Sequence, residues 1–149
     1  KKLHLGLVYQ DELIQIMSFR KYGNDEKYDY ELIHLCTKPG YQIIGGASKL
    51  FNFATHQYEM NNIIAFCDLS KFQGSVFEKI GMKKIDTLPP IKYWSVDDIA
   101  IPHSAIDKKF IFDIFGIKLK SKSDIEELML EHGWLPIYDC GQAVYEYRE

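Results

Sequence analysis

The stretch Gln42-Ile43-Ile44-Gly45-Gly46-Ala47 decides the fold that this sequence predicts. It follows the apolar run Glu31–Thr37, which is typical of a strand, and it leads into Ser48–Ala54, where apolar residues recur at helical spacing. A strand, a glycine turn and a helix start therefore stand in that order. The first amides of a helix have no partners within it, so this junction suits an anion such as a pyrophosphate. The same glycines would also serve a plain, tight strand-to-helix connection.

Composition indicates one domain and gives no general attraction to nucleic acid. The chain has 149 residues, is 46% hydrophobic and 14% aromatic, and carries a net charge of -3. A chain of this size buries one good core, and any contact with DNA would need a local basic patch. The three widely spaced cysteines Cys36, Cys67 and Cys140 indicate free thiols in a reducing cytoplasm and no disulfide framework.

Targeting signals are absent from the sequence as given. No apolar run approaches about 18 residues, and the start Lys1-Lys2-Leu3-His4 lacks the apolar region of a signal peptide. We therefore expect a cytoplasmic protein without membrane attachment. Because the chain begins at Lys1 and a strand follows almost at once, we also expect it to be a piece of a longer protein.

The first two thirds of the chain alternate strands and helices. We expect a hairpin of Leu3–Tyr9 and Leu13–Lys21, a third strand at Tyr28–Thr37, and a helix after the glycine turn. A strand at Asn62–Asp68 completes a strand, helix, strand unit, which implies parallel pairing. The elements expected next are a helix over Gly74–Ile80, a short run Met82–Ile85 and a closing strand at Ile91–Val96.

The last third contains helices and a hairpin. A helix-like segment spans Ile106–Phe115, and Ser123-Asp124-Ile125-Glu126 has the pattern of a capping box that opens a helix to about His132. The segment Trp134–Tyr147 predicts a β-hairpin that turns on Asp139–Gln142.

Two of these motifs resemble signatures of the GNAT N-acyltransferase superfamily. Gln42–Ala47 is similar to its acyl-CoA motif, Gln/Arg-x-x-Gly-x-Gly/Ala, and Gly74–Met82 resembles its second signature. The resemblance implies an α+β fold: a mixed, mostly antiparallel central sheet flanked by helices, with a C-terminal helix plus β-hairpin extension. It implies a GNAT-like core over residues 1–96, lacking the usual first strand and first helices, and an extension over residues 97–149 packed on the same domain. It also implies acetyl-CoA or another acyl-CoA as cofactor, bound by Gln42, Ile44, Gly45, Gly46, Ala47 and Ser48.

A narrower resemblance covers almost the whole chain. The tail Gly133–Gly141, together with Tyr30–Thr37 and Ile44–Leu50, resembles phage Hef-like homing-endonuclease-like proteins. It implies a C-terminal accessory domain of a phage or mobile-element protein in a bacterial host cell, which assists DNA recognition or positioning beside an upstream nuclease domain. That is the main hypothesis from sequence. The alternative is an acyl-CoA-dependent N-acyltransferase, which could modify DNA bases in the manner of Mom-type enzymes.

Candidate catalytic residues follow from the GNAT resemblance. That superfamily usually protonates the leaving CoA thiolate with a tyrosine of the second signature, and Phe77 stands at this position. Tyr93 or Cys67 could substitute. Glu31 and His34 are candidates for the base, although strict alternation places them on opposite faces of their strand unless a β-bulge intervenes, and a core histidine is the plainer interpretation of His34.

A basic segment near the C-terminus is a candidate nucleic-acid surface, whereas the histidines and cysteines do not predict a metal site. The segment Asp107–Lys122 interleaves aromatic residues with five lysines that are candidate phosphate contacts, although an amphipathic helix with solvating lysines fits the pattern too. These lysines are Lys108, Lys109, Lys118, Lys120 and Lys122. We expect no metal site, because neither Cys-x-x-Cys nor a paired-histidine spacing occurs.

Overall fold

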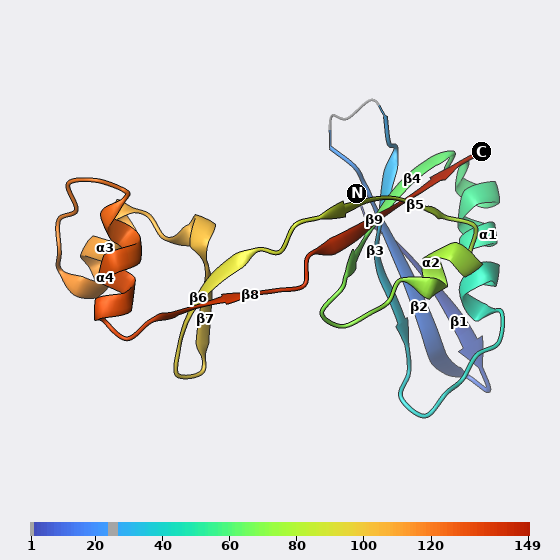
Figure 1. Ribbon diagram of the computed structural model, residues 1–149. Coiled ribbons are helices and arrows are strands. Elements are labelled where there is room, and N and C mark those ends of the chain that lie inside the picture. The colour runs from blue at the N-terminus through green and yellow to red at the C-terminus, as the bar shows by residue number, and fades with distance from the viewer. Residues whose placement is uncertain (1, 24–26) are drawn as a thin grey trace. The chain divides into compact units, whose positions relative to one another are not determined.

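The computed structural model describes residues 2–23 and 27–149, and the chain divides into two compact units (Figure 1). Unit 1 comprises Lys1–Leu88 and Gln142–Glu149, and unit 2 comprises Pro89–Gly141. The sequence predicted one boundary, after residue 96. The observed division differs because the chain leaves unit 1 after residue 88 and returns to it with its last strand.

Unit 1 is built on a mixed, mostly antiparallel sheet. Its six strands in the described residues lie in the order β1-β2-β3-β4-β9-β5, and only β3 and β4 pair in parallel. The predicted first hairpin and the predicted parallel pair are both confirmed. The strand bounds are β1 Lys2–Tyr9, β2 Glu12–Lys21, β3 Tyr30–Thr37, β4 Asn62–Asp68, β5 Lys83–Leu88 and β9 Gln142–Arg148.

The last strand corrects two predictions from sequence. Gln142–Arg148 does not fold back on Leu135–Tyr138 as a hairpin, but pairs with β4 and β5 in the sheet of unit 1. The expected closing strand Ile91–Val96 contributes instead to a separate sheet in unit 2. Three successive buried residues, Ala143, Val144 and Tyr145, explain the place of β9, since a strand that is apolar on both faces suits the interior of a sheet.

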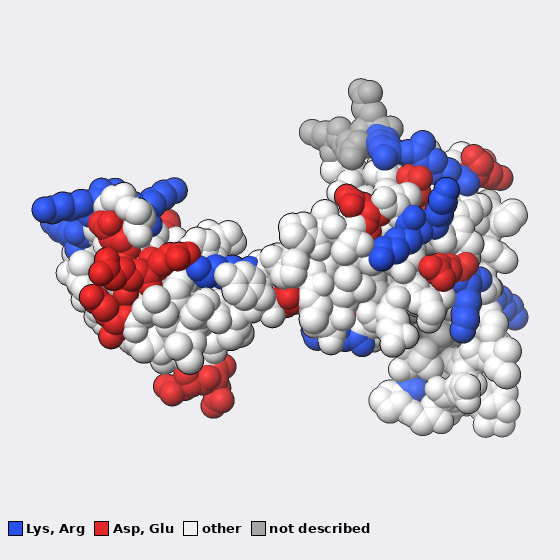
Figure 2. Space-filling view, in the orientation of Figure 1, with Lys and Arg blue, Asp and Glu red and all other residues white. Residues whose placement is uncertain are grey.

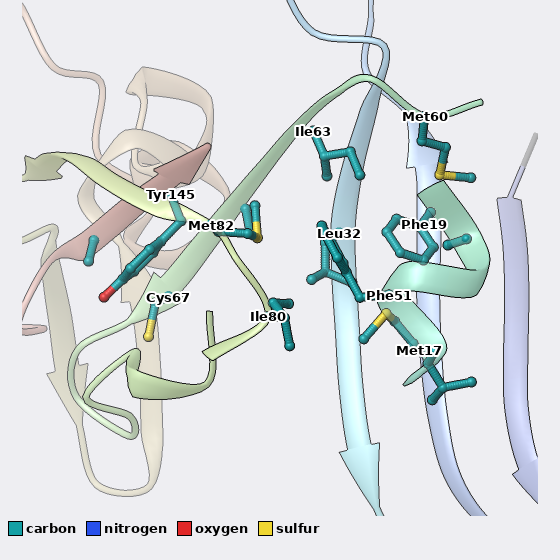
Figure 3. Packing of buried hydrophobic residues seen from close by; sticks show 14 residues of the cluster. Met17, Phe19, Leu32, Phe51, Met60, Ile63, Cys67, Ile80, Met82 and Tyr145 are labelled. Atoms are coloured by element: carbon teal, nitrogen blue, oxygen red, sulfur yellow. The ribbon is translucent and has the colours of Figure 1, made fainter. Parts of the chain in front are cut away.

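The main core lies between the sheet and α1, which spans Gly46–Tyr58. Met17 and Phe19 of β2 meet Phe51 of α1, with the Phe19 and Phe51 rings 6.4 Å apart (Figure 3). The helix buries Leu50, Phe51 and Ala54, which is the apolar spacing that predicted it. The shorter helix α2, Ser75–Lys79, ends in the buried Ile80 that packs in the same core.

A smaller cluster covers part of the opposite face of this sheet. Tyr28 is buried among Ile64 and Val144, and the Tyr22 ring contacts it edge-on at 6.1 Å. The Tyr28 hydroxyl donates a 2.9 Å hydrogen bond to Glu146, joining the start of β3 to β9. This bond, assisted by Arg148, lowers the pKa of the Glu146 carboxyl.

Unit 2 has its own core around Trp94. Its sheet has the order β7-β6-β8, with bounds β6 Lys92–Val96, β7 Ile99–Pro102 and β8 Leu135–Tyr138. The helices α3, Lys108–Phe115, and α4, Asp124–Glu131, supply Ile111, Ile125 and Met129 to that core. The buried indole of Trp94 donates a 3.0 Å hydrogen bond to Nδ1 of His103 in the 3-10 turn His103–Ala105.

The two helices of unit 2 begin differently. Asp107 caps α3 by accepting a 2.8 Å hydrogen bond from the Phe110 amide. The capping box predicted at Ser123 is wrong: its hydroxyl donates to Ser121 and Asp124 instead of accepting from the helix. Short polar side chains placed side by side satisfy one another locally, and this competes with capping.

The two ends of unit 2 are held together by one side chain. The Asp139 carboxylate accepts hydrogen bonds from the backbone amides of Ile91, at 2.7 Å, and Gly141, at 2.9 Å. The Asp139 amide donates in turn to the Ile91 carbonyl. Unit 2 is therefore a closed insertion between β5 and β9. Within residues 2–23 and 27–149, no helix has the length and apolar content that crossing a membrane requires.

We predict that Tyr28→Phe lowers the free energy of unfolding by about 1.5 kcal/mol at pH 7, since it removes a hydrogen bond to a carboxylate. The folded-state pKa of Glu146 is lowered, so this contribution is present above the unfolded value of about 4.3 and is lost as the pH falls through the folded value. Urea denaturation at pH 7 and pH 3 should therefore show a difference between wild type and variant that shrinks in acid. Tyr22→Phe is the matched control, and an equal effect of both variants would contradict the assignment.

Candidate active site

A β-bulge at Ile33 shapes the region that the glycine turn adjoins. β2 pairs Ser18 with His34 and Phe19 with Leu32, so Ile33 has no partner on β2. On one side of the bulge Leu32 faces the core, and on the other side Leu35 does so. An extra residue in one strand reverses the alternation of side chains beyond it and bends the strand.

The bulge determines on which face of the sheet the two candidate bases, Glu31 and His34, lie. Strict alternation predicted opposite faces for Glu31 and His34, but the extra residue places both on the face opposite to α1. Their surroundings differ. Glu31 is buried and forms a 2.7 Å ion pair with Arg20, whereas His34 is exposed, so its interpretation as a core histidine is wrong.

β3 and β4 separate at the bulge and leave a pocket between them. Their parallel pairing runs from Tyr30–Ile63 to Leu32–Ala65. Beyond these pairs lies a pocket of about 500 Å³, within the usual range for small-molecule sites. The residues that line it are mostly apolar: Gln15, Ile33, His34, Leu35, Cys36, Thr37, Ile43, Ala47, Phe66, Cys67, Asp68, Phe72, Gly74, Val76 and Phe77.

The first turn of α1 presents backbone amides at this pocket. Gly45 adopts a left-handed conformation, with φ of 73°, and no side chain of the described residues caps the helix. Gly46 is buried so closely that an added Cβ would lie 2.4 Å from Gln15 Oε1 and 2.5 Å from Ile43 Cγ2. The free amides of the first turn and the helix dipole favour an anion here. Lys49 adds positive charge in the same turn.

Gln15 contributes a polar group that the sequence did not reveal. Its side chain donates a 2.9 Å hydrogen bond to Thr37, while Oε1 is buried without a partner among the described residues. A buried acceptor of this kind costs free energy unless a ligand or water donates to it. Gln15 lines the pocket, so a bound molecule with an N–H or O–H group fits this position.

The start of α2 closes the other side of the pocket, and Tyr145 packs behind it without lining the pocket itself. The Tyr145 ring stacks on Phe77 with the centroids 4.9 Å apart. Its hydroxyl packs against Gly74, where a Cβ would lie 2.2 Å from the oxygen. Burial raises the pKa of Tyr145, with Glu78 and Cys67 adding to the rise, so the hydroxyl keeps its proton. No local sequence signal marks Tyr145, because β9 lies far along the chain from Phe77.

Electrostatics within the pocket are mild. The Asp68 carboxylate accepts hydrogen bonds from the hydroxyl and amide of Ser70, which lower its pKa. Burial raises the pKa of the Cys67 thiol, which therefore stays protonated at neutral pH. Among the described residues, no group of three or more His, Cys, Asp or Glu side chains is placed to hold a metal ion.

The predicted cofactor residues are placed as follows. Ala47 lines the pocket, Gly46 is buried beside it, and Ser48 is half-buried in the first turn of α1. Gln42 and Ile44 are exposed in the turn, Ile44 to 95%. The backbone of this turn is therefore better placed to bind a cofactor, as predicted, than the side chains of Gln42 and Ile44 are.

Tyr93, the third predicted catalytic residue, lies in β6 of unit 2. It is half-buried and is paired with Pro102 and Ile137 on the neighbouring strands. It is not among the residues that line the pocket, and it belongs to unit 2, whereas Glu31 and His34 belong to unit 1.

The predicted nucleic-acid lysines lie on unit 2, in α3 and the segment after it. Lys108 donates a 2.9 Å hydrogen bond to the Lys120 carbonyl, and Lys118 lies over the Phe112 ring. Unit 2 has nine acidic residues against six lysines in its sequence, and Figure 2 shows acidic side chains gathered over α4. The lysines thus sit on a unit of net negative charge. The full set is Lys108, Lys109, Lys118, Lys120 and Lys122.

Comparison of structures identifies the fold. A GNAT family acetyltransferase from Elizabethkingia anophelis with acetyl-CoA bound superposes with a TM-score of 0.51 at 12% identity, over 95% of this chain and 72% of the other. A Bacillus subtilis acetyltransferase in complex with CoA gives 0.51 at 13% identity, over 95% and 73%. The fold is the GNAT fold. No family model and no curated protein matches the sequence.

A further match is shorter. With aminoglycoside 6′-acetyltransferase type Ii the identity is 20%, the TM-score is 0.46, and the match covers 59% of each chain. The chain thus spans about three fifths of the length of that enzyme.

We predict that Gly46→Ala destabilises unit 1, although alanine is the better helix former by about 1 kcal/mol. Its methyl group would overlap Gln15 and Ile43, and overpacking of this kind costs about 1–3 kcal/mol. Thermal unfolding should therefore show a lower Tm. Ser48→Ala, in the same helical turn, is the control and should stay within about 0.5 kcal/mol of wild type. A Gly46→Ala variant with a higher Tm than wild type would refute the close packing.

Proposed function

We propose that this chain is an acyl-CoA-dependent N-acyltransferase. The observation that carries the proposal is the separation of β3 and β4 at the bulge, which leaves a pocket beside the uncapped first turn of α1. Two structures of the same fold contain CoA or acetyl-CoA. This function is the alternative from sequence rather than the main hypothesis.

The residues present fit an acyl-CoA. The amides of Gly46, Ala47 and Ser48 would hold its pyrophosphate, because a helix N-terminus offers donors and a favourable dipole. An extended amide-containing arm could donate to Gln15 Oε1 and pair with the β4-facing backbone of β3 beyond Leu32. Acyl-CoA supplies a thioester whose acyl group an amine can accept.

His34 is the proposed base for the acceptor amine. An amine attacks a thioester only after losing the proton that it carries at neutral pH. His34 lines the pocket and is exposed, so an acceptor can reach its ring. Glu31 is the poorer candidate, because its carboxylate is buried and already paired with Arg20.

Tyr145 is the proposed acid for the departing thiolate. Phe77 has no proton to give, but the Tyr145 hydroxyl lies behind Gly74, and Gly74 and Phe77 both line the pocket. Its raised pKa keeps this hydroxyl protonated in the resting protein. The expected order is loss of a proton to His34, transfer of the acyl group, and donation of a proton by Tyr145.

DNA recognition as an accessory domain of a phage homing-endonuclease-like protein stays a prediction from sequence. It depends on the five lysines of unit 2, which acidic residues outnumber in that unit. An excess of negative charge opposes association with phosphate backbones. A DNA-base acceptor and an upstream nuclease domain are likewise predictions that rest on the resemblance alone.

We predict that acetyl-CoA and CoA bind wild type and raise its Tm, because a ligand at a hundred times its Kd adds about 2.7 kcal/mol. Ser48→Glu should weaken binding about tenfold or more, since it places a carboxylate beside the amides proposed to hold the pyrophosphate. The helix itself tolerates an acidic residue in its first turn. Isothermal titration calorimetry measures the effect.

Gln57→Glu supplies the matched control for that experiment. It adds the same charge near the far end of α1 and should leave the affinity for CoA unchanged. If submillimolar CoA gives neither heat nor a Tm shift with wild type, the acyltransferase proposal is wrong. Equal weakening by both glutamates would show a general charge effect and no site at the turn.

We predict that Tyr145→Phe lowers kcat for acyl transfer by about a hundredfold or more, the usual scale for loss of a general acid. Stability should change little, because the lost hydroxyl has no hydrogen-bond partner among the described residues. Tyr147→Phe, on the same strand and half-buried, is the control. Adding Phe77→Tyr to Tyr145→Phe should restore part of the rate, and a fully active Tyr145→Phe would exclude this acid.

A further inference from the structure

Three polar side chains form a row across the face of the sheet opposite to α1. The strand register pairs His4 of β1 with Ser18 of β2, and Ser18 with His34 of β3. Directly opposite residues of antiparallel strands hold their Cβ atoms about 4.5–5.5 Å apart, so neighbouring side chains of the row can meet. The row begins at the pocket, which His34 lines, and ends at the exposed His4 on the outermost strand of this sheet.

Ser18 lies between the two histidines in the strand register and contacts His4. It is 2% exposed, and its hydroxyl lies 2.8 Å from Nδ1 of His4. A serine hydroxyl has one proton to donate and two lone pairs that accept. While bonded to His4 it therefore keeps room for a hydrogen bond from the ring of His34, directly or through one water.

On this face of the sheet, the side chains in the rows beside His4, Ser18 and His34 are paired or uncharged. The two histidines are therefore the groups of the row that can take up or release a proton. On one side the Glu31 carboxylate is paired with Arg20 at 2.7 Å, and on the other side Ile16 and Gly6 carry no charge. Imidazole is the side chain whose charge ordinarily changes near neutral pH. The other titratable groups of these strands and of the pocket are Lys2 and Tyr9 on β1, Glu12, Arg20 and Lys21 on β2, Tyr30, Glu31 and Cys36 on β3, and Cys67 and Asp68 on β4.

We propose that His4, Ser18 and His34 form a proton outlet from the acceptor side of the pocket. His34 accepts a proton from the acceptor ammonium at one ring nitrogen and releases the proton of its other ring nitrogen to the Ser18 oxygen. The hydroxyl proton of Ser18 passes to Nδ1 of His4, and His4 releases a proton to water. One proton thus moves from the amine to solvent. The inference rests on the acyltransferase function proposed above and makes His4 and Ser18 positioning residues that act through His34.

The kinetic test compares Ser18→Thr with Ser18→Val, which have nearly the same shape and differ by one hydroxyl group. With acetyl-CoA and a panel of primary amines, namely a polyamine, an aminoglycoside and a peptide, thiol release is followed from pH 5.5 to 9. Ser18→Val and His4→Gln should lower kcat about tenfold near pH 7 and shift the pH profile, with KM for acetyl-CoA unchanged. Ser18→Thr should stay near wild type, and so should His56→Gln, which alters a histidine in the last turn of α1.

A second measurement needs neither acyl-CoA nor an acceptor. NMR titration of the histidine ring signals should show His34 responding to the charge of His4, and His4→Gln and Ser18→Val should both shift the His34 curve. Ser18→Thr should leave the curve in place. A folding defect caused by added bulk would appear in both Ser18 variants and in thermal unfolding.

The two measurements separate failure of the outlet from failure of the proposed function. Coupled histidine titrations without turnover of any amine would support the outlet and count against the acyltransferase proposal. Turnover with equal rates for Ser18→Thr and Ser18→Val would overturn the outlet. So would a His34 titration that His4→Gln and Ser18→Val leave unchanged.

Discussion

The bulge at Ile33 is the constraint on which the candidate site depends. One extra residue ends the pairing of β3 with β4 after Leu32, and the strands then separate. The pocket, the accessible backbone of β3 and the direction of His34 all follow from that separation. Because side chains alternate with a period of two, the same extra residue carries His34 onto the face that already holds Glu31. A regular strand here would leave a closed sheet and no site.

The way the chain returns to its sheet also shapes the site. β9 pairs with β4 and β5 after the insertion of unit 2, and the Asp139 carboxylate joins the ends of that insertion. The return places Tyr145 against Phe77 and Gly74. Phe77, which lines the pocket, is thus backed by the hydroxyl-bearing ring of a tyrosine from a distant strand. Gly74 allows this contact because it lacks a Cβ.

Charge separates the two functional hypotheses. In unit 1 the amides of the first turn of α1 meet a pocket that is mostly apolar, an arrangement suited to a phosphate-bearing ligand with an extended arm. In unit 2 the lysines of α3 and of the segment after it belong to a unit in which acidic residues outnumber lysines, nine to six. The amides at the start of α1 add their dipoles at one point, which favours an anion. In unit 2 the negative carboxylates offset the positive charge of the lysines, so the unit attracts phosphates weakly. The acyltransferase that we propose therefore has its site in unit 1.

Local patterns in the sequence determined the elements whose causes are local. The glycine turn, the apolar spacing of α1, the first hairpin and the strand, helix, strand unit are encoded within short segments, and their predictions agree with the structure. The pairing of Gln142–Arg148 was decided by tertiary structure. A strand that is apolar on both faces can pair in the interior of any sheet, and its sequence does not specify that the neighbours are β4 and β5. The sequence left a β-bulge in this strand open as a condition but could not place it at Ile33, since an extra residue is defined only against a neighbouring strand. Gln15, Tyr145 and the row from His4 to His34 became neighbours only through that pairing, which is why sequence marked the cofactor turn but not the groups around it.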